Sequence, residues 1–276
     1  MEIRLHGHGV CLAHYGRPFD VARPTVVFVH GAGMDHSIWP LQARHFAYRG
    51  WNALAVDLPG HGRSGGELVG TIPAMADWVA DLILALRLPA VHLVGHSMGA
   101  LIGLDLAARH GDRLAGLALL GAAPRMPVHP ALLEAAARPD PLAPELICDW
   151  GFGPAGHFGG HKAPGSWMLG HALRLLSQSA GPRLHADLAA CNAYEGGPGA
   201  ASEVRCPTLI IAGALDRMTP ARHGTRLAES IQQARLLILP ECGHMMMVEQ
   251  PDATLDALLA FLKSELPAIA TGPTSA

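Results

Sequence analysis

The sequence has few charged residues, few aromatic residues and no excess of basic charge. Only 16% of its 276 residues are charged and 5% are aromatic, whereas 50% are hydrophobic. The formal net charge is −3 at pH 7, and a nucleic-acid or anionic membrane partner would require a basic face instead. This composition predicts a globular protein that acts on a small molecule, as a monomer or homodimer, without a nucleic-acid or membrane partner.

Disulfide and zinc patterns are also missing. The chain has 5 cysteines, an odd number, and none of them stands in a CxxC pair, so neither a disulfide framework nor a zinc site is expected. Free thiols are typical of a reducing compartment. No basic start followed by an apolar run opens the sequence, and no apolar run has the length of a membrane span. We therefore expect a cytoplasmic protein with no metal and no cofactor.

Short apolar runs alternate with longer helical patterns along most of the chain. The runs predict buried strands at Thr25–His30, Asn52–Leu58, Ala90–Gly95, Leu114–Gly121, Pro207–Gly213 and Ala234–Pro240. Glu2–Tyr15 is typical of a hairpin that turns near Gly7 and Gly9. The helical patterns cover Ile38–Arg49, Met75–Leu86, Met98–His110, Ala221–Ser230 and Asp252–Leu266. Such alternation predicts an α/β fold, a mostly parallel eight-stranded sheet flanked by helices.

One long stretch contains no buried-strand pattern. Helical segments are expected there at Ala131–Ala137, Glu145–Trp150, Ser166–Ser177 and Pro182–Tyr194, joined by connectors rich in Gly and Pro. We interpret residues 124–204 as a helical cap inserted into a core made of residues 1–123 and 205–268. Residues 269–276 are expected to form a flexible tail.

The stretch "LVGHSMGALIG" places a serine between glycines at the end of a predicted strand. Ser97 is followed directly by a predicted helix, and Gly95 and Gly99 stand two residues to either side. A sharp strand-to-helix turn would crowd those two positions and lift the serine side chain clear of the sheet. The pattern G-x-S-x-G in this context predicts a nucleophilic serine.

An acid and a base follow two later strands. Asp216 lies in "GALDRMTP" after one predicted strand, and His244 lies in "GHMMMVEQP" after the last one. A nucleophilic serine needs a base, and the base needs an orienting acid. The order Ser97, Asp216, His244 is the order that accompanies this type of turn.

Two backbone N–H groups are candidates for holding a developing oxyanion. The N–H of Met98 follows the nucleophile, and the loop "VHGAG" after the first buried strand offers the N–H of Ala32. Donors of this kind stabilise the negative charge that forms during acyl transfer.

Taken together, "VHGAG", "DLPGHGRS", "GHSMG", "GALDRMTP" and "GHMMMVEQP" resemble the α/β-hydrolase superfamily, in its esterase-like branch with a helical cap. The resemblance implies the α/β-hydrolase fold, with Ser97 as nucleophile, Asp216 as acid, His244 as base, and Ala32 with Met98 as oxyanion hole. Related enzymes with Asp or Cys in place of the serine perform other chemistry. Serine at position 97 indicates hydrolysis of a carboxylic ester or lactone.

Substrate contacts must come from the cap and the loop after His244. Apolar candidates are Trp150, Trp167, Met168 and Met245, which line a pocket or form the cap's own core. Arg125 either meets a substrate carboxylate or forms a surface salt bridge. Two alternatives to a small, largely apolar ester stay open, namely a C–C bond hydrolase of a vinylogous diketone and a catalytically slow ligand-binding protein.

Overall fold

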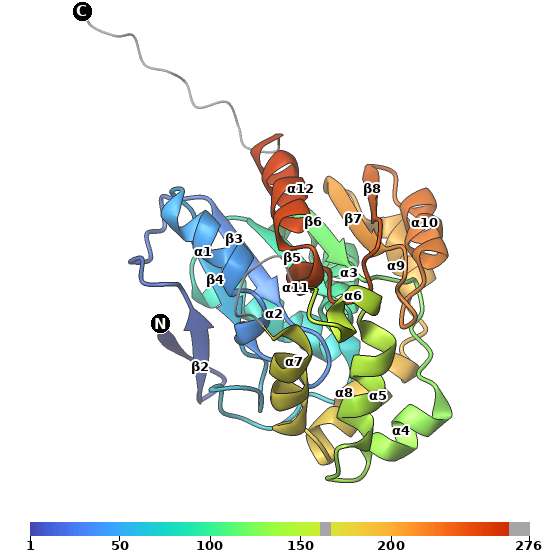
Figure 1. Cartoon of the computed structure of the whole chain (residues 1–276). Coiled ribbons are helices and arrows are strands. Elements are labelled where there is room, and N and C mark those ends of the chain that lie inside the picture. Colours follow the sequence, from blue (N-terminus) through green and yellow to red (C-terminus); the bar gives the residue numbers. More distant parts are fainter. Residues whose placement is uncertain (161–166, 265–276) are drawn as a thin grey trace, which may run out of the picture.

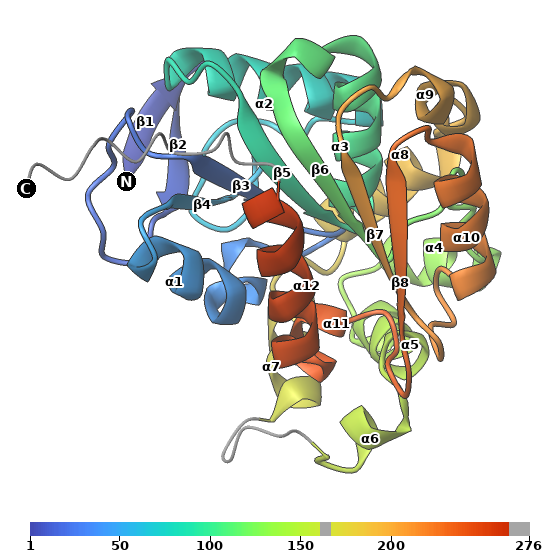
Figure 2. The ribbon, with the colours of Figure 1, turned by 90° about the horizontal axis from the view of Figure 1, so that it is seen from above.

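Eight strands form one mostly parallel sheet, as the alternation predicted. The computed structural model describes residues 1–160 and 167–264. The strands are β1 (Glu2–Leu5), β2 (His8–Ala13), β3 (Thr25–Val29), β4 (Asn52–Val56), β5 (Val91–His96), β6 (Leu114–Leu120), β7 (Thr208–Gly213) and β8 (Ala234–Leu239). Their order in the sheet is β1-β2-β4-β3-β5-β6-β7-β8 (Figures 1 and 2).

The hairpin stands at one edge, and the parallel part of the sheet carries the loops of interest. β1 pairs antiparallel with β2, and β2 pairs antiparallel with β4. From β4 to β8 the pairings are parallel. In the register, Val29 at the end of β3 pairs with Gly95, and Gly213 at the end of β7 pairs with Leu239 of β8. The carboxyl ends of these strands therefore lie along the same edge of the sheet.

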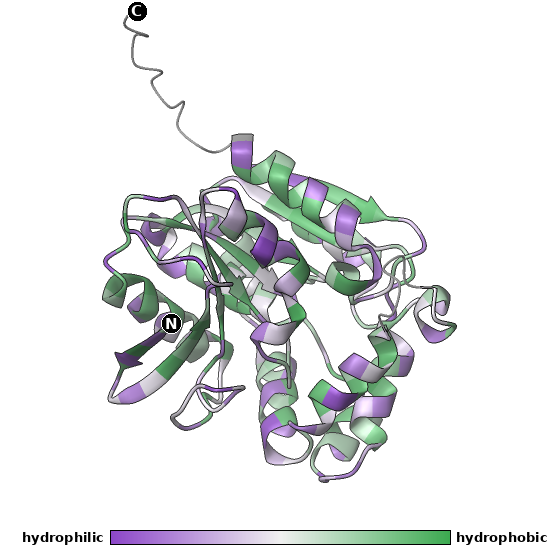
Figure 3. Ribbon diagram, turned by 60° about the vertical axis from the view of Figure 1, so that its left-hand side comes forward, coloured by the Kyte–Doolittle hydropathy of each residue, from purple (hydrophilic) through white to green (hydrophobic). Residues whose placement is uncertain are grey.

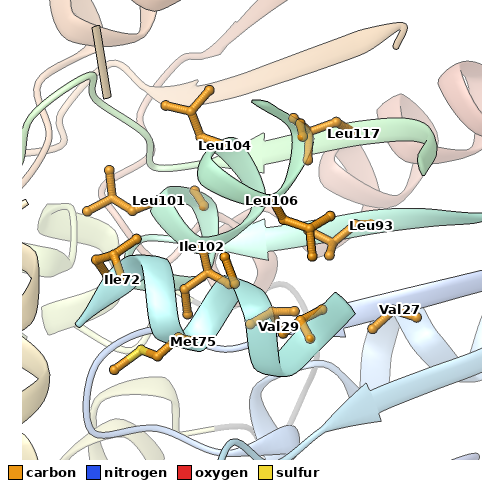
Figure 4. Close-up of a cluster of buried hydrophobic side chains, with 14 of the residues drawn as sticks. Val27, Val29, Ile72, Met75, Leu93, Leu101, Ile102, Leu104, Leu106 and Leu117 are labelled. Atoms are coloured by element: carbon orange, nitrogen blue, oxygen red, sulfur yellow. The ribbon is translucent and has the colours of Figure 1, made fainter. Parts of the chain in front are cut away.

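Helices cover both faces of the sheet, and each face has its own hydrophobic core. One face carries α2 (Ile72–Ala85), α3 (Met98–Arg109), α9 (Gly197–Glu203) and α10 (Ala221–Ser230), and the other carries α1 (Pro40–Tyr48) and α12 (Pro251–Ser264) (Figure 2). Figure 4 shows apolar side chains of α2 and α3 meeting those of β3, β5 and β6. The strands are largely hydrophobic along their length, whereas the helices alternate between hydrophobic and hydrophilic residues (Figure 3). Three short elements complete the fold: the 3₁₀ turns η1 (His36–Ile38) and η2 (Gly111–Arg113), and α11 (Met246–Glu249).

Helix α2 begins earlier than the sequence pattern predicted. The Thr71 hydroxyl oxygen accepts a hydrogen bond from the N–H of Ala74, and Pro73 lies in the first turn. A threonine cap and a proline in the first turn are ordinary features of a helix start. The buried face begins with Ile72, directly after the cap, so the helix start was set too late by the length of one turn.

A group of helices lies beyond the carboxyl ends of the parallel strands (Figure 1). These helices, inserted between β6 and β7, are α4 (Pro130–Ala136), α5 (Leu142–Gly151), α6 (Pro154–His157), α7 (Met168–Ser177) and α8 (Pro182–Ala193). We refer to them as the cap. Helix α9, which falls within residues 124–204, packs against α3 and α10 instead. Ser166, Leu266 and the expected tail at 269–276 lie outside the described residues. Within the described residues, no helix has both the length and the apolar character that crossing a bilayer demands.

Candidate active site

Ser97 occupies the turn between β5 and α3 in an unusual backbone conformation. Its φ is 54° and its ψ is −114°, a combination that costs a non-glycine residue about 1–3 kcal/mol and persists only where the surroundings impose it. Its neighbours His96 and Met98 are fully buried, whereas Ser97 is partly exposed. The turn therefore presents the serine side chain outward from the carboxyl edge of the sheet.

The two flanking glycines are required by backbone contacts. A Cβ on Gly95 would lie 2.2 Å from the carbonyl oxygen of Gly99, and a Cβ on Gly99 would lie 2.4 Å from the carbonyl oxygen of Val29. Both obstacles are main chain, so a side-chain rotation cannot relieve them. The crowding that the sequence pattern implied is present at both positions.

Asp216 and His244 are paired in the loops after β7 and β8. The Nδ1 of His244 lies 2.7 Å from the Oδ2 of Asp216, and both residues are buried. Oδ1 of Asp216 accepts the N–H groups of Met218 and Thr219, and Oδ2 also accepts the Thr219 hydroxyl. Burial raises the pKa of Asp216, but His244 and these donors outweigh that effect and bring the pKa down to about 2. Asp216 is therefore a carboxylate, and His244 Nδ1 donates to it.

The pairing leaves Nε2 of His244 free of the carboxylate. With its Nδ1 hydrogen engaged, a neutral imidazole has an acceptor lone pair on Nε2. The ring of His96, the residue before Ser97, lies 4.7 Å from the His244 ring, centroid to centroid. Ser97 and Thr219 line the same cavity, and the Thr219 hydroxyl is 3.1 Å from His244 Nδ1. The fold thus pairs the predicted acid with the predicted base, and Thr219, which contacts both, lines the cavity that also contains Ser97.

A buried glutamate that the sequence analysis did not single out holds the His244 loop. Glu249 of α11 accepts the N–H groups of Gly243, Met245 and Gly153. Burial raises its pKa, although the three N–H donors act in the opposite direction. The backbone N–H of His244 also donates to the carbonyl oxygen of Gly151, at 2.6 Å. The sequence signal that could have identified Glu249 was an acidic residue within the apolar run "MMMVEQ".

His96 anchors the same loop from the side of the sheet. Its Nε2–H donates to the carbonyl oxygen of His244, at 2.9 Å. Burial, followed by the neighbouring His244, lowers the pKa of His96 to about 3, so the ring is neutral. It therefore acts as a fixed donor to the backbone of the His244 loop.

The loop after β3 brings Ala32 to the cavity that contains Ser97. His30 fixes the start of this loop: its Nδ1–H donates to the carbonyl oxygen of Gly31, and its Nε2 accepts the N–H of Leu58. Burial, and then His61, lowers the pKa of His30 to about 4, which suits this neutral arrangement. Met98 opens α3, where the first N–H groups have no acceptor within the helix. Ala32 and Met98 thus remain the candidate oxyanion donors.

The cavity that contains Ser97 has a volume of about 140 Å³. Its walls come mostly from the cap and from the segment that leads into it: Met126, Pro127, Val128, His129, Leu132, Trp150, Leu188 and Cys191. Arg217, in the loop after β7, lines this cavity and also a wider groove of about 930 Å³ beside α6. The small cavity is mainly apolar, and it shares Arg217 with the groove.

Of the five proposed substrate contacts, the structure brings Trp150 to this cavity. Met168 and Met245 are buried in the core between the cap and the sheet, where they line a separate, smaller cavity. Trp167 is 71% exposed. Arg125 pairs with Glu195 at 2.7 Å on the surface, which is the salt-bridge alternative. The expected pocket wall is therefore corrected: the two methionines pack between the cap and the sheet, and Trp150 lines the cavity that contains Ser97.

One group of side chains within the described residues has the composition of a metal site. Ligand atoms of Cys11, His36 and Asp57 lie within 4.8 Å of one another. The Asp57 carboxylate, however, already accepts the backbone N–H and ring Nδ1–H of His36 and the backbone N–H of Arg63. Burial raises the pKa of Asp57, but these donors outweigh it and lower the pKa overall. These hydrogen bonds connect the loop after β3, which contains His36, to the loop after β4, which contains Asp57 and Arg63.

Residues 26–257 match the Alpha/beta hydrolase family. The chain belongs to this family. It is a hydrolase, with the eight-stranded sheet, flanking helices and esterase-like relatives that the sequence resemblance implied.

Individual relatives of this hydrolase cover most of its length. A pimeloyl-[acyl-carrier protein] methyl ester esterase from Chromobacterium violaceum is 31% identical over 88% of this chain and 95% of its own. A presumed carbamate hydrolase from Agrobacterium fabrum is 30% identical over 88% and 94%. In structure, the enol-lactonase from Burkholderia xenovorans superimposes with a TM-score of 0.83 at 24% identity, covering 95% of this chain and 100% of its own. That last likeness concerns the fold.

Proposed function

We propose that this hydrolase cleaves a small, largely apolar carboxylic ester or lactone through an acyl-enzyme on Ser97. The observation that carries the proposal is the buried Asp216–His244 pair, 2.7 Å apart, together with the partly exposed serine of a strained strand-to-helix turn. Relatives named for a methyl ester and a carbamate support acyl chemistry of this class.

The proposed reaction has two steps. His244 Nε2 takes the proton from the Ser97 hydroxyl as the oxygen attacks the substrate carbonyl carbon, and the N–H groups of Ala32 and Met98 bind the oxyanion. His244 then returns the proton to the leaving alcohol. A water molecule, deprotonated by His244, attacks the acyl-enzyme and releases the acid. Asp216 remains ionised throughout and stabilises the imidazolium.

The cavity volume limits the acyl group. At about 140 Å³, the cavity is close in size to the engineered protein cavity of about 150 Å³ that binds benzene. Its apolar lining favours a hydrocarbon chain, and the wider groove at Arg217 offers a path for the alcohol. We therefore expect acyl chains of about four to six carbons to fit best.

The test is hydrolysis of p-nitrophenyl esters of increasing acyl length by the wild type and by Ser97→Ala. The variant removes only the hydroxyl group and adds no crowding, so it should fold, and turnover should fall by about 10⁶-fold because triad members act as a unit. A fluorophosphonate probe should add its mass to Ser97 of the wild type. Well-folded protein that hydrolyses no ester and is not labelled would overturn the proposal and direct attention to diketone cleavage or slow ligand binding.

We further propose a reducing compartment, the cytoplasm, as the place of action. Each cysteine is a free thiol, and burial raises the pKa of the Cys148 thiol to about 12. Thiols of this kind are typical of intracellular proteins.

A further inference from the structure

A buried carboxylate in the cap takes no part in the proposed reaction. Asp187 of α8 is 1% exposed, although aspartate is seldom buried without partners. Its Oδ2 accepts the backbone N–H of Gly33 at 2.8 Å and contacts Nε2 of His61 at 2.8 Å. Both partners belong to core loops that are more than a hundred residues away in sequence.

The first partner places Asp187 next to the proposed oxyanion hole. Gly33 directly follows Ala32, so its N–H is part of the peptide group that contains the Ala32 carbonyl carbon. Gly33 has a φ of +67°, and a Cβ there would lie 2.7 Å from Cδ1 of Leu184 on the same cap helix. Helix α8 therefore rests directly on this loop, and the hydrogen bond to Asp187 fixes the orientation of one of its peptide groups.

The second partner, His61, is hydrogen-bonded at both ring nitrogens. Nδ1 of His61 lies 2.9 Å from the carbonyl oxygen of Pro59, which can only accept, so Nδ1 carries a hydrogen. Its Nε2 faces Asp187, and the two side chains are 2% and 1% exposed. A hydrogen bond therefore joins Nε2 and Oδ2 in a buried pair. Removing one member of a buried pair leaves the other uncompensated, which is costly.

The same helix also forms part of the substrate cavity. Leu188 and Cys191 of α8 line the cavity that contains Ser97. Docking of α8 on the core thus sets both the cavity wall and the loop that carries Ala32.

We propose that Asp187 is a positioning residue for the reaction: from the cap, it holds the Gly33 peptide so that the Ala32 N–H points at the oxyanion. The inference rests on the proposed function. Catalytic donors must be held to within a fraction of an ångström. The loop therefore reaches its working geometry only when α8 is docked, and Asp187 acts on the transition state more than on the bound ester.

The experiment compares Asp187→Asn and Asp187→Ala with Asp105→Asn, using the best ester of the series. Asn keeps an oxygen acceptor but removes the charge, so kcat should fall about 10-fold. Ala should lower kcat about 100-fold, approaching the loss of one oxyanion donor. KM should change less than about 3-fold, because the cavity wall at Leu188 and Cys191 is retained.

Asp105→Asn is the matched control. Asp105 is also buried and ties the end of α8 to the core, since its Oδ2 accepts the Tyr194 hydroxyl at 2.8 Å. It lies on α3, about 12 Å along the helix from Ser97 at 1.5 Å per residue. This substitution should lower the melting temperature while leaving kcat unchanged.

Inhibition by an alkyl boronic acid provides a readout that general destabilisation would not move. The Ser97 oxygen adds to boron to form a tetrahedral anion that occupies the oxyanion site. Affinity for the boronic acid should fall in parallel with kcat/KM in the Asp187 variants, whereas affinity for the carboxylic acid product should not. If Asp187→Ala does not fold, Asp187→Asn and His61→Gln carry the test.

The possible failures are distinguishable. Wild-type kcat and boronate affinity in folded Asp187 variants would overturn the positioning role, as would a raised KM with unchanged kcat. A wild type without any esterase activity or serine labelling would instead overturn the proposed function itself.

Discussion

At the scale of single residues, buried neutral histidines hold the loops of the site. His30 donates to the loop that carries Ala32, and His96 donates to the backbone of His244. Burial lowers the pKa of His30 to about 4 and that of His96 to about 3. Both rings are therefore uncharged in the folded enzyme at any pH above these pKa values.

This arrangement predicts a loss of stability in mild acid. Between pH 6.5 and pH 4 the unfolded chain binds protons on these histidines and the folded chain does not, so the free energy of unfolding falls as the pH falls. A pKa lowered from 6.5 to about 4, as for His30, corresponds to about 3 kcal/mol at pH 4. Urea unfolding at pH 7, 6, 5 and 4 would measure this decrease in the free energy of unfolding.

The variant His96→Gln isolates one of the two contributions. Glutamine retains an N–H donor but does not titrate, so the dependence on pH should become shallower. His8→Gln, which changes an exposed histidine on β2, should leave the slope unchanged. Equal slopes in all three proteins would contradict the assignment of neutral buried rings.

At the scale of elements, the β5–α3 turn tolerates no side chain at its glycines. Gly95→Ala would place a Cβ 2.2 Å from a carbonyl oxygen, and only a backbone shift could accommodate it. We expect the free energy of unfolding to fall by about 3 kcal/mol or more, with loss of activity because Ser97 moves. Chemical denaturation and fluorophosphonate labelling would check both effects.

Gly111→Ala is the comparison for this turn. Gly111 begins η2 at the far end of α3, and a Cβ there would meet nothing within 4 Å. Reduced freedom of the unfolded chain should make this variant more stable by about 0.4–1 kcal/mol. A Gly95→Ala protein as stable as Gly111→Ala would show that the turn is less constrained than the contacts indicate.

At the scale of the whole molecule, buried polar contacts join the cap to the core at separate points. Asp187 binds the loops of Gly33 and His61, and Glu249 binds the cap at Gly153. Each contact loses its partner if the cap separates, so opening exposes unsatisfied polar groups. The cap is therefore part of the same cooperative structure as the sheet.

Cap and core are accordingly expected to unfold in one transition. Thermal unfolding followed by far-ultraviolet circular dichroism should coincide with that followed by an environment-sensitive dye on a cysteine introduced by Leu142→Cys, at an exposed position of α5. The labelled protein also carries Cys206→Ser, because the other four native cysteines are buried. In Asp187→Ala the dye signal should change at a lower temperature than the dichroism. Separate transitions in the wild type would contradict a single cooperative unit.

The sequence correctly predicted the strands, the order of the helices and the residues next to strand ends, because those features depend on local patterns. Ser97, Asp216 and His244 each follow a buried strand, and parallel strands bring such residues to one edge. Asp187 and Glu249 have no local signature, since their partners become neighbours only after folding. Met168 and Met245 were assigned to the pocket because apolar residues mark a buried face without saying what lies opposite. Trp167 lies on the surface, which its apolar character did not indicate.

Helix α8 has a consequence for how this enzyme could change its substrate range. Leu188 and Cys191 shape the pocket from the same helix that carries the Asp187 contact, so enlarging the pocket there risks disturbing the oxyanion loop. Leu132 of α4 and Trp150 of α5 also line the pocket, and neither makes a contact with the oxyanion loop among those described above. Directed evolution toward bulkier acyl groups should therefore accumulate substitutions at Leu132 and Trp150 and leave α8 intact.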